Sequence, residues 1–466
     1  MSQIFKKIFF VVLISIGFIA CFSKDNKNTK TIAILEKGKI IEKVNCKKDV
    51  TTSYALYIPS TYDSTKKHPL IIVFDSHANG LKPVTLFKSQ AEKYGYIIVG
   101  SNNSKNGTPW PTTNSIYNSM MLDINERFSI DKNRIYAAGF SGGSRVASTI
   151  AIQNGGIAGV IGFSAGFPNL NQPITNKFDY IGVCGNADFN YNEMSELDKN
   201  LESIKFNHYL LVFNGKHEWP SQEIIPDIFY WLEFCAYRNK LSSPSISTIK
   251  AFIDKCEKEI GDFKLKNNLF DEYKIVSKLI RFLDGVSEID SYKTKFAELE
   301  KTTAVQNELK LIETDITKEK TLQGNYMKAM NANDSKWWIT EVVKINNLIS
   351  QNKNERETLI YKRILSFLSI GAYSYSNNAL KSGQLEKAQH FITIYSLVDP
   401  ENSEAPYFQA ELYAMKNEND KALISIENAI KLGFDDINRI QTDSSFSRLS
   451  TTQAFTNLVE KMKIKK

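Results

Sequence analysis

Seven short runs of β-branched and aromatic residues, separated by helical stretches, constrain the fold of the first half of the chain most strongly. They lie at 54–58, 70–74, 96–99, 134–138, 159–163, 180–184 and 209–213. Several are apolar at nearly every position, which is typical of parallel strands that are covered on both faces. Helical patterns follow at 115–127, 143–154 and 223–235. We therefore predict a mostly parallel sheet with helices on both faces over residues 52–240.

The second half of the chain follows a different pattern, which begins after a Ser- and Pro-containing segment at 241–247. Residues 248–466 carry only two prolines and keep helical periodicity almost throughout. Small residues recur there at a spacing of 34, at Ser376, Ala388, Ala410 and Ala422. This period resembles the tetratricopeptide (TPR) repeat. We predict an all-α region, with a helical domain or degenerate repeats over 248–360 and TPR-like repeats over 361–466. A generic helical bundle is the alternative.

The N-terminus has the three-part pattern of an export signal. Two lysines, Lys6 and Lys7, precede an apolar run, and the run ends before Ala20 and Cys21. This ending resembles a bacterial lipoprotein signal, in which the cysteine is lipidated. We therefore expect residues 1–20 to be a signal peptide and 21–51 a tether and N-terminal segment. Lipidation of Cys21 would anchor the exported chain to the outer membrane, on its periplasmic or its cell-surface side. Ordinary cleavage near Ala20 is the alternative.

Charge and cysteine content argue against nucleic-acid binding and against a metal site. The formal net charge is +7, and removal of Lys6 and Lys7 with the leader leaves +5 on a long chain. This excess is too small to predict nucleic-acid binding. The remaining cysteines lie at 46, 184, 235 and 256 and form no CxxC motif or His/Cys cluster. We expect no metal site and no cofactor.

The strongest chemical signal is the sequence GFSGG at 139–143. A predicted strand leads into it and an apolar helix rich in small residues leads out. This is the context of a nucleophile elbow, in which flanking glycines let a serine stand exposed on a sharp turn. The pattern makes Ser141 the candidate nucleophile.

A serine nucleophile needs a base and an acid that orients the base. His217 follows the last predicted strand, in a loop at the carboxyl edge of the sheet. Asp188 follows the preceding strand by four residues, whereas Asp179 lies at the wrong end of that strand and the acids between 193 and 202 have helical spacing. We therefore predict Ser141, His217 and Asp188 as a catalytic triad.

With these motifs, residues 52–237 resemble α/β-hydrolases of the esterase group related to polyhydroxybutyrate depolymerases and feruloyl or acetylxylan esterases. The motifs GFSGG, CGNAD and GKHEWP carry the resemblance, which covers less than half of the chain. Such esterases often have His-Gly after the third strand, where this chain has DSHANG. The oxyanion hole is therefore assigned to the backbone of Gly142 and of either Ser76 or His77.

Polar and aromatic residues near the same edge of the sheet are candidates for a substrate pocket. They are Asn102, Asn103, Trp110 and Trp219. Amides and aromatic rings suit a hydroxyl-rich ligand such as a sugar, although the composition is also that of an ordinary surface loop.

These features predict a serine esterase that acts on carboxylic esters, with carbohydrate-linked acyl groups as one substrate class. A peptidase or phospholipase could use the same triad. A different class, a TPR adaptor with a vestigial hydrolase domain, is the alternative, and in either case the repeats would bind a protein partner. The Ser/Pro segment at 241–247 predicts two separable modules, so residues 31–240 are expected to fold alone.

Overall fold

The computed structural model describes residues 35–168 and 174–464, and from Glu36 onward they form one compact unit. The predicted signal peptide, Cys21 and the rest of the predicted tether up to residue 34 lie outside the described residues. Within the described part, no helix combines the length and the apolar character that a bilayer crossing requires.

The described strands form one eight-stranded sheet in the order β1-β2-β4-β3-β5-β6-β7-β8. They are β1 (Ile40–Asn45), β2 (Ser53–Tyr57), β3 (His68–Phe74), β4 (Ile97–Ser101), β5 (Ile130–Phe140), β6 (Gly159–Phe163), β7 (Asp179–Gly185) and β8 (His208–Phe213). Pairing is antiparallel from β1 to β2 and from β2 to β4, and parallel elsewhere. All seven predicted strands are present. The edge strand β1 was missed because only Val44 in it is buried.

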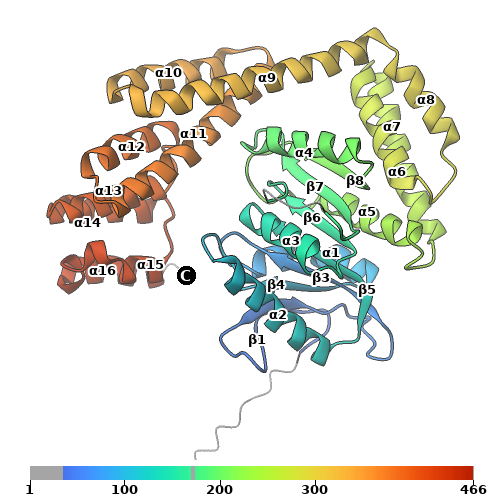
Figure 1. Cartoon of the computed structure of the whole chain (residues 1–466), viewed down its shortest axis with the longest axis horizontal. Helices are drawn as coiled ribbons and strands as arrows, with labels where there is room; N and C mark the ends of the chain where they lie inside the picture. The colour runs from blue at the N-terminus through green and yellow to red at the C-terminus, as the bar shows by residue number, and fades with distance from the viewer. Residues whose placement is uncertain (1–34, 169–173, 465–466) are drawn as a thin grey trace, which may run out of the picture. The chain divides into compact units, whose positions relative to one another are not determined.

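Helices cover both faces of this sheet (Figure 1). They are α1 (Leu81–Tyr94), α2 (Trp110–Arg127), α3 (Gly142–Gln153), α4 (Tyr191–Ser203) and α5 (Ile225–Arg238). In β3, Ile71 and Val73 pack with α1 and α5 in one core. The alternate residues Leu70 and Ile72 point to the other face and are equally buried. The predicted α/β-hydrolase fold is confirmed by this order of strands and helices.

The core of the sheet domain continues past the 241–247 segment. Phe252 of α6 (Ile246–Leu265) and Phe282 of α7 (Leu269–Leu283) belong to the same buried cluster as Trp231 of α5. The Phe282 ring lies 5.2 Å from Trp231 and 5.0 Å from Phe252. A 31–240 fragment would leave this side of α5 uncovered. The packing therefore argues against the expectation that the fragment folds alone.

Helix α8 (Asp290–Glu300) packs on α6 and α7 through Leu299. The helices that follow it form a second core, as the helical periodicity predicts. They are α9 (Thr303–Ala332), α10 (Ser335–Gln351), α11 (Glu355–Lys381), α12 (Leu385–Val398), α13 (Glu404–Met415), α14 (Asn419–Lys431), α15 (Ile437–Thr442) and α16 (Gln453–Ile464). The side chains of Thr302, Asp334 and Asn354 accept backbone hydrogen bonds at the starts of α9, α10 and α11. The four small residues spaced by 34 are fully buried in the pairs α11–α12 and α13–α14.

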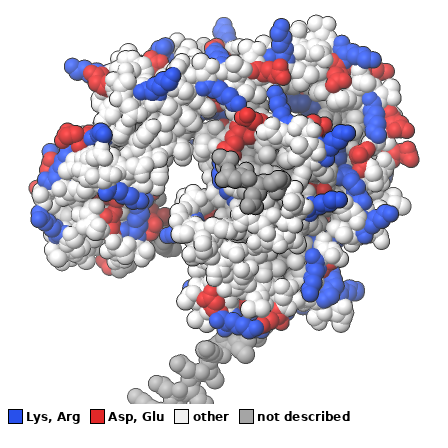
Figure 2. Space-filling view, in the orientation of Figure 1, with Lys and Arg blue, Asp and Glu red and all other residues white. Residues whose placement is uncertain are grey.

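Charged side chains of both signs are interspersed over the helical half on the face shown in Figure 2. Several of them are paired between helices, as Lys318 is with Glu357 and Arg356 with Asp315.

Candidate active site

Ser141 lies on a strained turn between β5 and α3. Its φ of 55° and ψ of −119° give it a backbone conformation that residues other than glycine rarely adopt. A Cβ on Gly139 would lie 2.1 Å from the carbonyl oxygen of Gly143, and one on Gly143 would lie 1.9 Å from that of Phe74. The two glycines are therefore required by backbone packing, as the elbow motif predicts.

The structure brings Ser141, His217 and Asp188 together. The Nε2 atom of His217 lies 3.0 Å from the Ser141 Oγ, and its Nδ1 lies 2.9 and 3.1 Å from the two carboxylate oxygens of Asp188. Asp188 is fully buried, whereas the His217 side chain keeps 20% of its surface exposed. The imidazole can thus take a proton from the serine at one nitrogen while the other nitrogen donates to a buried carboxylate.

Two phenylalanines flank the imidazole. The ring centroid of Phe189 lies 4.2 Å from that of His217, and the centroid of Phe140 lies 4.9 Å away. Contacts with two aromatic rings restrict the imidazole to orientations near the one that reaches Ser141. Neither phenylalanine was predicted at the site from the sequence, although each is adjacent to a predicted triad residue.

The loops that carry the acid and the base are joined by hydrogen bonds. The backbone N–H of Asn186 donates to the carbonyl of Phe213 at 2.8 Å, and its side-chain oxygen accepts from the N–H of Gly215 at 3.3 Å. The N–H of Ala187 donates to the Gly215 carbonyl at 2.9 Å. Asp188 and His217 are therefore placed as one assembly at the ends of the neighbouring strands β7 and β8.

The backbone geometry distinguishes between the two alternatives for the oxyanion hole. Gly142 is the first residue of α3, where backbone N–H groups have no intrahelical acceptor. The N–H of His77 donates to Asp75 Oδ1 at 2.8 Å, and its imidazole is 84% exposed. Because the His77 N–H already has an acceptor, the geometry favours Ser76 over His77 as the candidate beside Gly142.

Three of the four predicted pocket residues make structural contacts with their side chains. Asn102 donates to the carbonyl of Glu42, and Asn103 bridges the backbone of residues 51 and 53, so both amides hold the β1–β2 edge. Trp219 is buried, donates to Asp75 and packs on Phe140 at 5.3 Å. All four residues stay predictions for the pocket, and Trp110, half-exposed at the start of α2, has the freest side chain of the aromatic pair.

A different residue of the 101–107 loop lies at the elbow. A Cβ on Gly142 would lie 1.8 Å from the side-chain oxygen of Asn106, so this amide lies directly against the turn. The N–H of Asn106 also donates to the carbonyl of Ser76 at 2.9 Å. The polar loop therefore contacts both candidate oxyanion donors through Asn106, which the sequence analysis did not single out.

The described cysteines are all buried, and Cys184 lies near the acid of the triad. Each cysteine of the described chain, at 46, 184, 235 and 256, is a buried free thiol. Burial, together with the nearby Asp188 carboxylate, raises the pKa of the Cys184 thiol. Across the same residues, no three His, Cys, Asp or Glu side chains gather in a group that could hold a metal ion.

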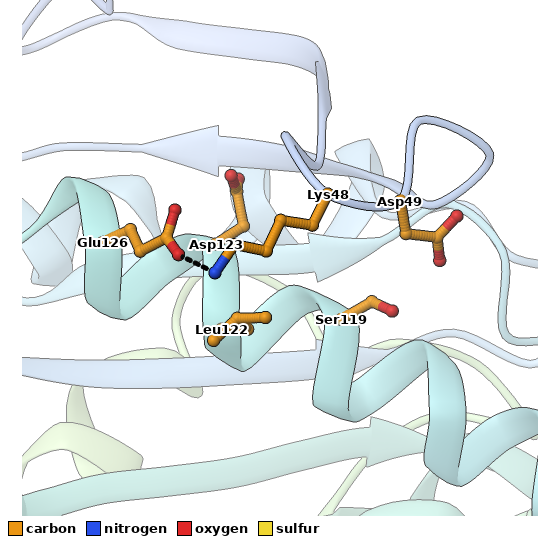
Figure 3. A pocket seen from close by; sticks show the side chains of 6 residues that line it. All are labelled: Lys48, Asp49, Ser119, Leu122, Asp123 and Glu126. Atoms are coloured by element: carbon orange, nitrogen blue, oxygen red, sulfur yellow. Dashed lines mark ion pairs between the residues drawn. The ribbon is translucent and has the colours of Figure 1, made fainter.

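Two cavities outside the triad also have defined linings. Figure 3 shows one of about 160 Å³, whose lining residues are Lys48, Asp49, Ser119, Leu122, Asp123 and Glu126. Lys48 and Glu126 form an ion pair at its edge, at 2.5 Å. The other cavity, of about 360 Å³, lies between the acid loop and the helices α7, α9 and α11.

Comparison with known proteins gave matches to solved structures alone. No family model and no curated protein matches this chain. S-formylglutathione hydrolase from Staphylococcus aureus matches 43% of this chain and 98% of its own, at 14% identity and a TM-score of 0.35. A feruloyl esterase module from Clostridium thermocellum matches 40% of this chain and 85% of its own, at 17% identity and a TM-score of 0.34. A ferulic acid esterase from Anaeromyces mucronatus matches 39% and 84%, at 19% identity and a TM-score of 0.31.

Proposed function

We propose that the protein is a serine hydrolase that cleaves carboxylic esters through an acyl-enzyme. The observation that supports it best is the hydrogen-bonded chain from Ser141 through His217 to Asp188, with the serine on a strained turn. Strain is retained at a position such as Ser141 only where the surrounding structure enforces it, and it concentrates at functional sites.

In the proposed reaction, the Ser141 oxygen attacks the ester carbonyl while its proton passes to His217 Nε2. The N–H groups of Gly142 and Ser76 would stabilise the negative oxygen of the tetrahedral intermediate. The imidazolium then gives its proton to the leaving alkoxide, and the acyl group stays on the serine. A water molecule then gives a proton to His217 and attacks the acyl carbon, and the carboxylic acid leaves as Ser141 takes the proton back. Asp188 orients the imidazole throughout and stabilises its charged form.

The acyl group and the alcohol are left open by the site. A sugar-binding role for the 101–107 loop has lost its main support, because Asn102 and Asn103 are bound to backbone groups. We therefore propose carboxylic esters as the substrate class, without a carbohydrate requirement. A panel of acetyl, short-chain and feruloyl nitrophenyl esters will distinguish these groups.

The test is covalent labelling by a fluorophosphonate, which reacts with an activated serine. Wild-type protein should be labelled and should hydrolyse nitrophenyl esters. Ser141→Ala should lose both properties, and His217→Ala should lose at least three orders of magnitude in kcat/KM, roughly the effect expected for a triad base. Ser115→Ala, at an exposed serine of α2, is the matched control. A folded wild-type protein that is neither labelled nor active would refute the proposal.

A protein-binding role is the second candidate. Burial of the four small residues at a spacing of 34 supports TPR-like packing in α11–α14, and such repeats present binding surfaces to other proteins. A folded chain without labelling or turnover that still binds a protein from its host would favour the adaptor.

We also propose export and lipid anchoring, from the sequence of the first 21 residues. In its own host, Cys21→Ser should move the protein from the membrane fraction to the soluble fraction. Equal membrane retention of the variant and the wild type would contradict anchoring through Cys21.

A further inference from the structure

Arg363, in the helical half, is hydrogen-bonded to the loop that carries Asp188. Arg363 lies within α11 and is 5% exposed. Its Nη1 donates to the backbone carbonyl of Asn186 at 2.6 Å, although the two residues are 177 positions apart in the chain. Asn186 precedes Asp188 by only two residues.

Three partners fix the position of the guanidinium. The Nε and Nη2 atoms of Arg363 lie 2.8 and 2.6 Å from one carboxylate oxygen of Glu319. Glu319 lies in α9, and its side chain is fully buried. The guanidinium also lies 4.7 Å from the ring centroid of Tyr191, at the start of α4. A guanidinium has a rigid plane with several N–H groups, so it can satisfy the carboxylate, the carbonyl and the ring at once. A lysine could not do so.

The carbonyl that Arg363 binds belongs to the residue that joins the two catalytic loops. Asn186 is hydrogen-bonded to Phe213 and Gly215, on the loop that leads to His217. A shift of the Asn186 backbone would therefore move the Asp188 carboxylate relative to the imidazole. Displacements of about 1 Å at such positions cost roughly a hundredfold in rate in enzymes.

We propose that Arg363 is a positioning residue for the acid of the triad, so that the helical half completes the hydrolase site. This inference rests on the proposed function. Arg363 acts through Asn186 and not on the substrate itself. Its loss should therefore lower kcat and leave KM nearly unchanged.

The cavity of about 360 Å³ provides a direct readout for this role. Arg363 lines it together with Asn186 and Tyr191. When Arg363 is replaced by alanine, guanidinium ions can enter from the cavity and occupy the vacated position. Rescue by added guanidinium distinguishes loss of the cation at this point from general destabilisation, which guanidinium would make worse.

Arg356 provides a matched control. It lies two turns earlier on α11, lines the same cavity, and forms ion pairs with Glu308 and Asp315 of α9. We expect Arg363→Ala to lose roughly tenfold to a hundredfold in kcat on a nitrophenyl ester. Arg356→Ala should keep kcat within about twofold of wild type, since both of its ion-pair partners lie on α9 and neither lies on the Asp188 loop. Millimolar guanidinium should restore part of the kcat of Arg363→Ala and none for Arg356→Ala.

Removal of Arg363 also leaves Glu319 buried without its partner, so the single variant could fail to fold. The double variant Arg363→Met, Glu319→Gln removes both charges at similar volume and serves as the second test. A folded variant of either kind with wild-type kcat would overturn the proposal. So would a loss in Arg363→Ala that Arg356→Ala matches and guanidinium does not reverse. Failure of the hydrolase proposal itself is separate, because the wild type would then be unlabelled and inactive.

Discussion

Phe282→Ala tests whether the helices after residue 247 are part of the hydrolase core. Phe282 is fully buried, and its ring contacts Tyr209 of β8, Trp231 of α5 and Phe252 of α6 at centroid distances of 5.0–5.2 Å. Truncation of a buried phenylalanine costs about 3–5 kcal/mol. Aromatic pairs add about 0.5–1.5 kcal/mol each. We therefore expect a loss near the upper end, at about 4–5 kcal/mol, which is a large share of a typical domain stability.

The loss should appear in the sheet domain itself. Urea unfolding can be followed by tryptophan fluorescence and, in parallel, by fluorophosphonate labelling of Ser141, and both midpoints should fall together. Phe270→Ala, on the same helix at a half-exposed position, should cost only about 1 kcal/mol. If Phe282→Ala lowers the fluorescence midpoint while the labelling midpoint stays at the wild-type value, the shared core is refuted. The fragment 31–240 should aggregate, whereas 31–300, which keeps α6 and α7, should stay soluble.

Two further predictions concern the elbow and the half-buried carboxyl pair of Glu411 and Asp443. Gly143→Ala should lower the free energy of unfolding by about 3 kcal/mol or more, because the new Cβ meets the Phe74 backbone. Gly142→Ala should lower it far less, because its Cβ meets the end of the Asn106 side chain, which can move. Thermal unfolding of the two variants measures the difference. Burial and the adjacent Asp443 raise the pKa of Glu411 to about 9, so the folded state holds a proton that the unfolded state loses above about pH 4.5. Stability should therefore fall as pH rises towards 9, and urea midpoints of Glu411→Gln should show a smaller fall.

The sheet could be predicted because buried parallel strands leave a strong local signal. Apolar runs such as 159–163 and 70–74 correspond to β6 and β3 within two residues. The strand β1 could not be found in this way, since an edge strand with one buried side chain has no apolar pattern. The continuation of the core into α6 and α7 was missed for another reason. Phe252 and Phe282 fit any amphipathic helix, and periodicity does not say which partner their apolar face meets.

The triad residues could be proposed from chain order and strand ends, and the structure places their side chains within hydrogen-bond distance. The contacts of the predicted pocket asparagines could not be predicted, because an asparagine in a loop has two common uses, to bind a ligand or to satisfy the backbone. Asn102 and Asn103 have the second use, whereas Asn106, three residues on, lies at the elbow. All three are asparagines of one polar loop, so residue type alone does not distinguish them. The difference depends on which backbone groups of β1 and of the 51–53 segment lack partners, and that is a property of the folded chain.

The nucleophile and the acid are held in place by different means. Ser141 is fixed by backbone contacts among Gly139, Gly143 and Phe74, which lie within one βα unit and its neighbouring strand. Asp188 lies on a loop whose hydrogen bonds extend to the β8 loop and, through Arg363, to a helix far along the chain. Changes in the helical half should therefore alter the acid–base pair before they alter the elbow. A binding partner that displaced α11 would act on catalysis by the same route, through the carbonyl of one residue beside the acid.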